Sequence, residues 1–550
     1  MKNPKGPKLG KRAQALLKKQ EENSFSKEPS TAEEFLEQGS IDEESGDRWL
    51  GSDLSKSLRF YQRAYTSYLE SIRLQTPAEP NLDSYYNSSR LLYQVYYQYF
   101  KTDGVNVYEL TNVEDALGGG QSSVVQPLSN IVEAHEVSMR VAATMNIPVP
   151  MDLLFNTAVV YTEVLEAEQE NDTSDYNQLL ELTFNAQQIL GTLLDRQVSE
   201  FHKFLQELEE TSSASFESEP VSSNQQVSQE QSKQEEYTSV EVVQPTDIFE
   251  TIIASYKLCQ SMLENINHSD QQKLSATDLI NPFLSKCDEI TLNLIDKYSE
   301  ANSQRNEMIS NISLSQIDEL KVAKTAIIGL TMNDLDQILQ LWDDSGLPDT
   351  SERYMVAADN IQSLLDRFDI TLAVVNSSGD AQAADTYWNA LTKMGSYLKK
   401  AQTKLDQNLQ EKKKIPSGVD LGLGALISQL SEVIIARADI DLQRSQIMGH
   451  ESAQKNQQIL LQNTKTLLKN AMNISNTPGG LRERVAEKLQ REKKKVDAVI
   501  RMCVLEKKTS VQELDSILGR AKWTNELPSI QRLGYYDGFG VQGIQNVSDF

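Results

Sequence analysis

The side chains that most often do chemistry are few and scattered in this sequence. The histidines have no other histidine or cysteine at metal-ligand spacing, and the cysteines are spread equally widely. Two glycine-rich stretches lack what phosphate binding needs. GGGQSS at 118–123 has no Gly-Lys-Ser/Thr after it, and GLGAL at 422–426 has no third glycine. We predict no catalytic residue, no cofactor and no metal site, hence no enzyme; the residues considered are His135, His202, His268, His450, Cys259, Cys287 and Cys503.

Binding chemistry is better represented, by three asparagines in a shared context. Asn87, Asn156 and Asn185 each follow an aromatic residue and precede a small one, in SYYNSSRLL, LLFNTAVVY and LTFNAQQIL. An Asn amide donates and accepts hydrogen bonds, so it can hold an extended backbone without reading its sequence. We take these residues as a candidate partner groove. The alternative is that they cap or solvate helix ends.

The acids indicate which partner such a groove prefers. Glu43, Glu44, Asp47 and Asp53 lie in the same part of the chain, and the whole protein has 79 Asp and Glu against 53 Lys and Arg. The resulting net charge of −26 disfavours bulk binding to phosphate backbones. Complementary charge favours a protein partner with basic segments.

Composition also bears on the compartment. No apolar run approaches the ~18 residues that span a bilayer, and the charged N-terminus has no apolar stretch after it, so we expect no membrane span and no secretory signal. Three scattered cysteines, an odd number, fit a reducing compartment. We expect a cytoplasmic or nuclear protein, or one found in both places.

The chain divides on composition into five segments. The first 19 residues hold seven Lys and Arg and no acid, which indicates a basic arm. A stretch after residue 210 is dominated by Ser, Thr, Gln and Glu and predicts a disordered linker. The last ~30 residues are Gly-rich and without periodicity, which predicts a tail. The predicted segments are an arm at 1–30, a block at 31–210, a linker at 211–245, a block at 246–520 and a tail at 521–550.

Both blocks are predicted to be helical. Apolar residues recur at steps of three and four, for example in DLLFNTAVVYTEVLEAEQE and LISQLSEVIIARADIDLQRSQI. Breaks coincide with turn chemistry such as TPAEPN, NIPVP and NTPGG. Segments of ~15–25 residues with short connections describe stacked antiparallel helices. The predicted fold class is therefore all-α.

One stretch, SGDRWLGSDLSKSLRFYQRAY, resembles a tetratricopeptide repeat. The family pairs a small residue and an aromatic on a first helix with small and aromatic residues on a second. Gly46 and Trp49 match the first pair, Ser57 and Tyr61 the second, and Ala64 is the small residue one turn later. The resemblance implies that the small residues permit a tight helix crossing and that Trp49 and Tyr61 wedge between the helices. It covers roughly residues 32–210 with degenerate spacing, and the chain as a whole is similar to an uncharacterised group of fungal proteins.

Two further patterns have competing interpretations. Ten of the 20 tyrosines lie between Tyr61 and Tyr108, which suggests either packing between helices or an aromatic binding surface; their helical spacing favours packing. The basic run LQREKKKVDAVIRMCVLEKK is interleaved with acids such as Asp497, which is one turn before Arg501. We expect this run to form a solvated helix face.

The sequence predicts a TPR-like α-solenoid that acts as an interaction scaffold, or as an escort or assembly factor for a partner with a basic extended segment. Stacked helical repeats present long concave surfaces suited to such work. The alternative is an RNA-associated assembly factor that contacts RNA through the N-terminal basic arm. Removal of residues 1–19 separates the two, because an RNA contact would be lost and a groove contact would survive.

Overall fold

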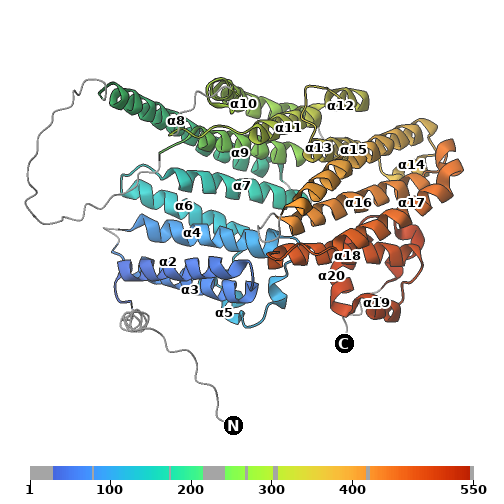
Figure 1. The fold of residues 1–550 in the computed structure, drawn as a ribbon, viewed down its shortest axis with the longest axis horizontal. Coiled ribbons are helices and arrows are strands. Elements are labelled where there is room, and N and C mark those ends of the chain that lie inside the picture. The colour runs from blue at the N-terminus through green and yellow to red at the C-terminus, as the bar shows by residue number, and fades with distance from the viewer. Residues whose placement is uncertain are drawn as a thin grey trace, which may run out of the picture.

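The computed structural model describes residues 29–76, 80–171, 175–214, 242–266, 270–301, 308–415 and 422–544 (Figure 1). Every regular element in these ranges is a helix, and no β-strand occurs in them. The all-α prediction is confirmed. None of the described helices is both long and apolar enough to cross a membrane. The predicted basic arm at 1–30 falls outside the described residues, apart from its last two positions.

The N-terminal helices begin where the sequence supplies capping groups. The Thr31 hydroxyl accepts from the Glu34 amide, the Asp53 carboxylate from Lys56, and the Asn81 side chain from Asp83. These bonds start the first three helices. The elements are α2 (Ala32–Leu50), α3 (Leu54–Leu74), α4 (Leu82–Tyr96), the π-helix η1 (Tyr97–Lys101), the 3₁₀ turn η2 (Val107–Glu109), α5 (Glu114–Leu117), α6 (Leu128–Thr144), α7 (Met151–Asn171) and α8 (Tyr176–Ala214).

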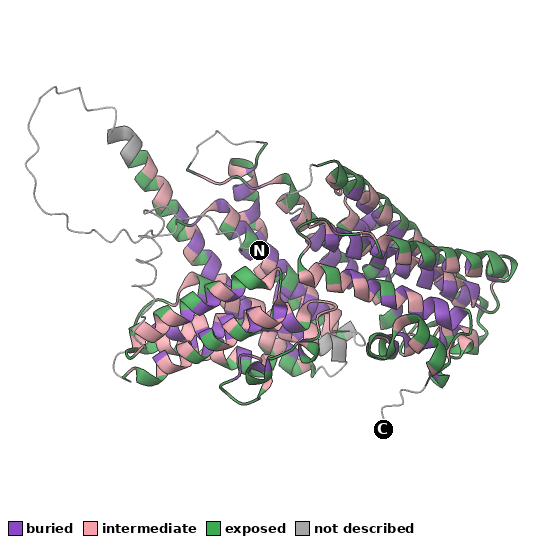
Figure 2. Ribbon diagram, turned by 60° about the horizontal axis from the view of Figure 1, so that its bottom comes forward, coloured by how far each residue is buried: buried purple, intermediate pink, exposed green. Residues whose placement is uncertain are grey.

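The second half of the chain continues in the same way. The elements are α9 (Pro245–Glu264), α10 (Asp270–Tyr298), α11 (Leu314–Thr331), α12 (Leu335–Trp342), α13 (Ser351–Arg367), α14 (Leu372–Ser378), α15 (Ala381–Lys414), α16 (Leu423–Ser445), α17 (Glu451–Ser475), α18 (Val485–Leu505), α19 (Val511–Leu518), α20 (Arg520–Gln531) and the 3₁₀ turns η3 (Asp537–Phe539) and η4 (Val541–Gly543). Long helices pack on those nearest in chain order, and buried residues follow their contacting faces (Figures 1 and 2). This arrangement is typical of a helical repeat.

The hydrophobic core crosses the predicted linker at 211–245. Leu194 and Phe201 of α8 belong to the same buried cluster as Phe249 and Ile252 of α9. The two predicted blocks therefore reflect composition, but they do not have separate cores. Helix α8 also continues through Ala214, four residues into the predicted linker, because a nucleated helix extends at little cost. Residues 215–241 lie outside the described part of the chain.

The hairpin of α2 and α3 is built on glycine against tyrosine. A Cβ at Gly46 would lie 2.5 Å from Cε1 of Tyr61, and one at Gly39 would lie 2.4 Å from Cε1 of Tyr68. The two glycines and the two tyrosines are both seven residues apart, so antiparallel helices bring both pairs into register. Only glycine permits this approach. Ser57, Tyr61 and Ala64 are all buried in the same hairpin.

Trp49 does not wedge between the helices as expected. Its side chain is 37% exposed, and the Lys56 ammonium lies 3.4 Å from its ring centroid. The Tyr61 ring already fills the space opposite Gly46, which leaves Trp49 on the flank of the hairpin. There it makes a cation–π contact.

The predicted tail at 521–550 is wrong for the residues that the structure describes. Helix α20 buries Trp523, Leu527 and Ile530, and the segment after it buries Tyr536 and Ile544. All five belong to the large core cluster of the C-terminal half. The prediction overlooked the helical spacing of Trp523, Leu527 and Ile530. The turns after α20 leave no periodic signal, and the glycines there serve those turns, as Gly540 does at a φ of 85°.

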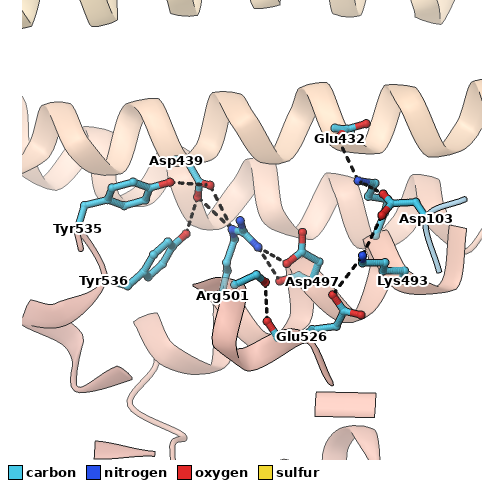
Figure 3. A network of polar contacts seen from close by, with 11 residues as sticks. Asp103, Glu432, Asp439, Lys493, Asp497, Arg501, Glu526, Tyr535 and Tyr536 are labelled. Carbon is cyan, nitrogen blue, oxygen red and sulfur yellow. Dashed lines mark hydrogen bonds and ion pairs between the residues drawn. The ribbon is translucent and has the colours of Figure 1, made fainter. Parts of the chain in front are cut away.

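The basic run around α18 is not a solvated face either. Arg491, Lys494 and Arg501 are buried, and Arg501 lies between Asp439 and Asp497 (Figure 3). The hydroxyls of Tyr535 and Tyr536 donate to the same Asp439 carboxylate, at 3.1 and 2.6 Å. The segment that the sequence presented as a tail covers this helix, which explains both errors. The Asp497–Arg501 pair is present as its spacing indicated.

The α2–α3 hairpin gives a test of packing. Replacing Ala64 by Leu adds bulk at a fully buried position and should lower the free energy of unfolding by ~1–3 kcal/mol. Thr66→Leu, at an exposed position on the same helix, should change it by less than ~0.5 kcal/mol. Urea denaturation of the full chain measures both. Equal effects would show that Ala64 is not at a close-packed contact.

The shared α8–α9 core gives a second test. The composition of 211–245 predicts preferential proteolysis there. Because Leu194 and Phe201 pack with Phe249 and Ile252, the nicked chain should elute from a sizing column as one species of unchanged size. Two separately eluting fragments would contradict the continuous core.

Candidate functional site

A pocket of about 450 Å³ lies where α4, α7, α8 and α9 meet. The starts of α4, α7 and α9 and the second half of α8 surround it. Its polar lining holds three carboxylates and no Lys or Arg. The lining residues are Tyr86, Met151, Asp152, Phe155, Asn156, Gln197, Val242, Val243, Asp247, Glu250 and Thr251.

Helix starts place two of the acids. The prolines of NIPVP end the preceding turn, so α7 begins at Met151 and Asp152 falls in its first turn. Pro245 occupies the first turn of α9, where its missing N–H costs nothing, and Asp247 follows it. The Asp247 carboxylate accepts a hydrogen bond of 2.8 Å from the Gln244 amide. Acids at helix N-termini are favoured by the helix dipole, so these two are stable without a ligand.

Glu250 has less local support. It lies one turn after Asp247 and is exposed at the pocket. Partial desolvation, followed by the nearby carboxylates of Asp247 and Glu319, raises its pKa. In the described part of the chain, no Lys or Arg forms an ion pair with Asp152, Asp247 or Glu250. Among the described residues, no Lys or Arg side chain therefore neutralises the carboxylates of this pocket.

Two polar side chains on facing helices close one wall. Asn156 of α7 donates from Nδ2 to the Tyr86 hydroxyl of α4 at 2.9 Å. Burial and then Asp152 raise the pKa of Tyr86 to about 12, so the phenol stays neutral. The bond uses one of the two amide donors of Asn156 and holds its side chain at the pocket wall.

Gln197 contributes an unsatisfied acceptor. Its side chain lines the pocket and is only 7% exposed, and its Oε1 has no hydrogen-bond partner among the described residues. A buried polar atom left without a partner costs about 1–3 kcal/mol. Such an atom can accept from a donor that enters the pocket, either water or a ligand.

The residues that line this pocket can accept hydrogen bonds from cationic donors. Carboxylate and amide oxygens converge on it, while Met151, Phe155 and Val243 supply apolar walls for an aliphatic stem. The side chains of Lys and Arg combine these two features. In the described ranges, no group of three or more His, Cys, Asp or Glu side chains is placed to hold a metal ion.

A second acidic pocket differs in an instructive way. It has a volume of about 320 Å³ and lies among α7, α9, α11 and α13. Its Glu319 is paired with Lys257 at 2.8 Å, and its Glu166 is paired with Lys101. Two of its four glutamates thus have a lysine from the chain itself, whereas Glu264 and Glu352 line it without an ion pair among the described residues.

The structure does not unite the three predicted groove residues. Asn156 lines the pocket. Asn87 is half-buried on α4 next to Tyr86 but does not line it, and Asn185 is exposed on α8 and also lies outside it. A repeated sequence context placed the residues on helices, but it did not place them on one surface.

The predicted acids of the first block are already engaged. Glu43 is buried and bonds Arg90 and the Tyr68 hydroxyl, at 2.5 and 2.8 Å. Asp47 accepts from Tyr61, Glu44 pairs with Arg48, and Asp53 caps α3. These contacts engage the four acids within and around the hairpin, and their role in attracting a basic partner stays a prediction.

Gln197, Asp247 and Glu250 escaped the sequence analysis. Asp247 and Glu250 lie just beyond the predicted linker, at the start of a helix, and that position was the only available signal. Nothing in the sequence distinguishes Gln197 from the other glutamines of α8. Its significance depends on burial without a partner, which is a property of the fold.

The chain is similar to a fungal protein along most of its length. A family model described as the YNL193W C-terminal domain matches residues 355–527. The Saccharomyces cerevisiae protein named "Uncharacterized protein YNL193W" is 25% identical over 501 residues, which is 84% of this chain and 87% of the yeast protein. These similarities indicate an uncharacterised fungal family and leave the tetratricopeptide resemblance untested. The family match lies outside the pocket.

The unsatisfied Gln197 oxygen predicts an unusual response to substitution. Gln197→Met removes the polar atom at similar volume and should raise the free energy of unfolding by ~1 kcal/mol. Gln187→Met on the same helix is the matched control, because Gln187 is 6% exposed but donates to Cys259 Sγ. It should be neutral or destabilising. Thermal unfolding of the full chain measures both, and destabilisation by Gln197→Met would show that its oxygen is satisfied.

Proposed function

We propose that this protein is a non-catalytic interaction scaffold, or an escort or assembly factor, that holds a basic extended segment of a partner protein. The binding site is the pocket among α4, α7, α8 and α9. The observation that carries the proposal is the buried, unpartnered Oε1 of Gln197 in a pocket lined by acids. In this proposal the helices that form the pocket belong to a degenerate tetratricopeptide-like array. The protein acts in the cytoplasm, the nucleus or both.

The recognition has three parts. The carboxylates of Asp152, Asp247 and Glu250 attract a Lys or Arg side chain, and the Gln197 oxygen accepts from one of its N–H groups. Asn156 bonds the backbone of the segment through the groups that Tyr86 does not use. The pocket volume lies in the range of pockets that enclose ligand-sized groups.

The surrounding charge supports a basic partner rather than an acidic one. The net charge of −26 favours encounter with cationic segments. Asp152 and Glu250 are exposed, so each contributes modestly once water screens it. Affinity therefore depends on several weak contacts, which suits a reversible hold on a partner.

The site can be tested by measuring how the full-length protein binds a labelled peptide of about twelve residues in which lysine and glycine alternate. Asp152→Asn with Glu250→Gln should weaken its binding about fivefold, or ~1 kcal/mol. Gln197→Met should weaken it as well, although it stabilises the fold. Fluorescence anisotropy gives the dissociation constants, and affinity should fall as salt is added.

The matched control removes two exposed acids elsewhere, with Asp278→Asn on α10 and Glu411→Gln on α15. It changes the net charge equally and should leave the affinity nearly unchanged. If this control lowered the affinity as much as the pocket variant, the peptide would be responding to net charge alone. The pocket would then not be the site.

Binding should also depend on pH, with a sign set by Glu250. Its pKa is raised in the free protein, and a bound cation favours its ionised form. Acidification protonates Glu250, so affinity should fall as the pH is lowered through the raised pKa. In Glu250→Gln this component of the pH dependence should disappear, and its persistence would assign it to another group.

A further inference from the structure

The pocket lies at the end of the stack where the chain enters α2. The Ala32 carbonyl at the start of α2 accepts from the Ser71 hydroxyl at 2.6 Å, and Ser71 lies 2.8 Å from the Ser84 hydroxyl of α4. Tyr86, two residues after Ser84, bonds Asn156 in the pocket wall. A short series of contacts thus connects the start of α2 to the pocket.

The sequence before α2 is long enough to reach it. Neighbouring helix axes are 8–10 Å apart, so the path from α2 past α4 to α7 is roughly 20 Å. Residues 20–28 separate the basic stretch 1–19 from the described chain, and nine extended residues span ~30 Å. The stretch 1–19 can therefore meet the pocket without strain.

Charge distinguishes this segment from the other candidate nearby. Residues 215–241 precede Val242 at the pocket but contain six Glu and one Lys, so the carboxylates would repel them. Residues 1–19 contain seven Lys and Arg and no acid. They match the donor chemistry that Asp152, Glu250 and the Gln197 oxygen require.

We propose that residues 1–19 occupy the pocket of their own chain when no partner is bound, and that a partner's basic segment must displace them. The proposal rests on the proposed function, since it assigns a regulation to the same site. The arm then satisfies the Gln197 oxygen and the uncompensated carboxylates in the free protein. It also excludes ligands that bind more weakly than the arm does.

The strength of the effect follows from tethering. A short flexible tether gives an effective concentration of ~1 mM. An arm that binds with a dissociation constant of ~0.1 mM would be bound about nine-tenths of the time, and it would weaken a competitor about tenfold. A weak intramolecular contact is thus sufficient to make the site selective.

The test uses the full chain and the alternating lysine–glycine peptide. The arm variant replaces Lys8, Lys11, Arg12 and Lys18 by Gln, and it should bind the peptide ~3- to 10-fold more tightly than the unmodified chain. The control replaces four exposed lysines elsewhere, Lys393, Lys399, Lys413 and Lys469, by Gln. It changes the net charge by the same amount and should bind as the unmodified chain does.

A double-mutant cycle connects the arm to the pocket. With Asp152→Asn and Glu250→Gln already present, the arm variant should gain much less affinity, because the arm no longer competes at an intact site. An equal gain in both backgrounds would overturn the proposal, since the arm would then act elsewhere.

The outcomes separate this proposal from the one on which it rests. If the arm variant binds no more tightly while the pocket variant still weakens binding, self-occupancy is wrong and the proposed function stands. If the pocket variant has no effect on the peptide even in a chain that also carries the arm variant, the proposed function fails and the occupancy fails with it. With the arm intact and bound, only a small effect is expected, because the pocket variant weakens the binding of the arm and of the peptide together. If light scattering showed that the unmodified chain is a dimer and the arm variant a monomer, the arm would bind a second copy of the chain rather than its own pocket. Arm-dependent binding of oligouridine without a gain in peptide affinity would assign it to nucleic acid.

Discussion

The pairing of buried charges on α18 is the constraint on which the rest of the structure depends. Arg491, Lys494 and Arg501 are each less than a tenth exposed. A buried charge without a partner is strongly destabilising, so each must find one. Arg491 bonds Glu483, Lys494 bonds Asp103 and Glu432, and Arg501 bonds Asp439. Asp103 also accepts a hydrogen bond from Lys493, which is 390 residues later in the chain. The need to pair these buried charges therefore links the N-terminal helices to α18 (Figure 3). Although burial alone would raise its pKa, Lys494 and Lys493 lower the pKa of Asp103 to about 2, which keeps it ionised.

This closure lies at the opposite end of α4 from the candidate site. Tyr86 lies in the first half of α4 at the pocket, and η1 continues the helix to Lys101, just before Asp103. At 1.5 Å per residue the two ends are ~22 Å apart. Val485 donates to the Gly51 carbonyl at the end of α2, and Gly104 lies so close to Leu489 that a Cβ there would be 2.6 Å from its carbonyl oxygen. One end of the N-terminal helices is thereby held by α18, while the end with the pocket remains accessible from solvent.

Features that depend on local periodicity could be predicted from the sequence. Burial of a helix by a segment distant in the sequence could not. Steps of three and four gave the all-α class, and the small and aromatic residues at Gly46 and Tyr61 located a tight crossing. The charged α18 was assigned to the surface because its covering segment, with Tyr535 and Tyr536, has no periodicity of its own. Of the candidate groove, only Asn156 was found, since the position of an asparagine around a stack depends on helix orientation. Gln197 had no signal, because an unsatisfied hydrogen bond exists only in three dimensions.

The contrast between the two charged regions supports a division of labour. Around α18 the buried cations Arg491, Lys494 and Arg501 all have carboxylate partners, and two tyrosine hydroxyls donate to a single carboxylate. In the pocket the same chain leaves the carboxylates of Asp152, Asp247 and Glu250 without an ion pair among the described residues, and one amide oxygen without a partner. Folding gains nothing from the unpartnered Gln197 oxygen, because an apolar side chain at this position would be less costly. Proteins violate their own packing rules mainly where function requires it. We therefore propose that the unsatisfied Gln197 oxygen is better explained by what binds it than by what folds the chain, and that a segment rich in Lys and Arg would supply the donor that it lacks.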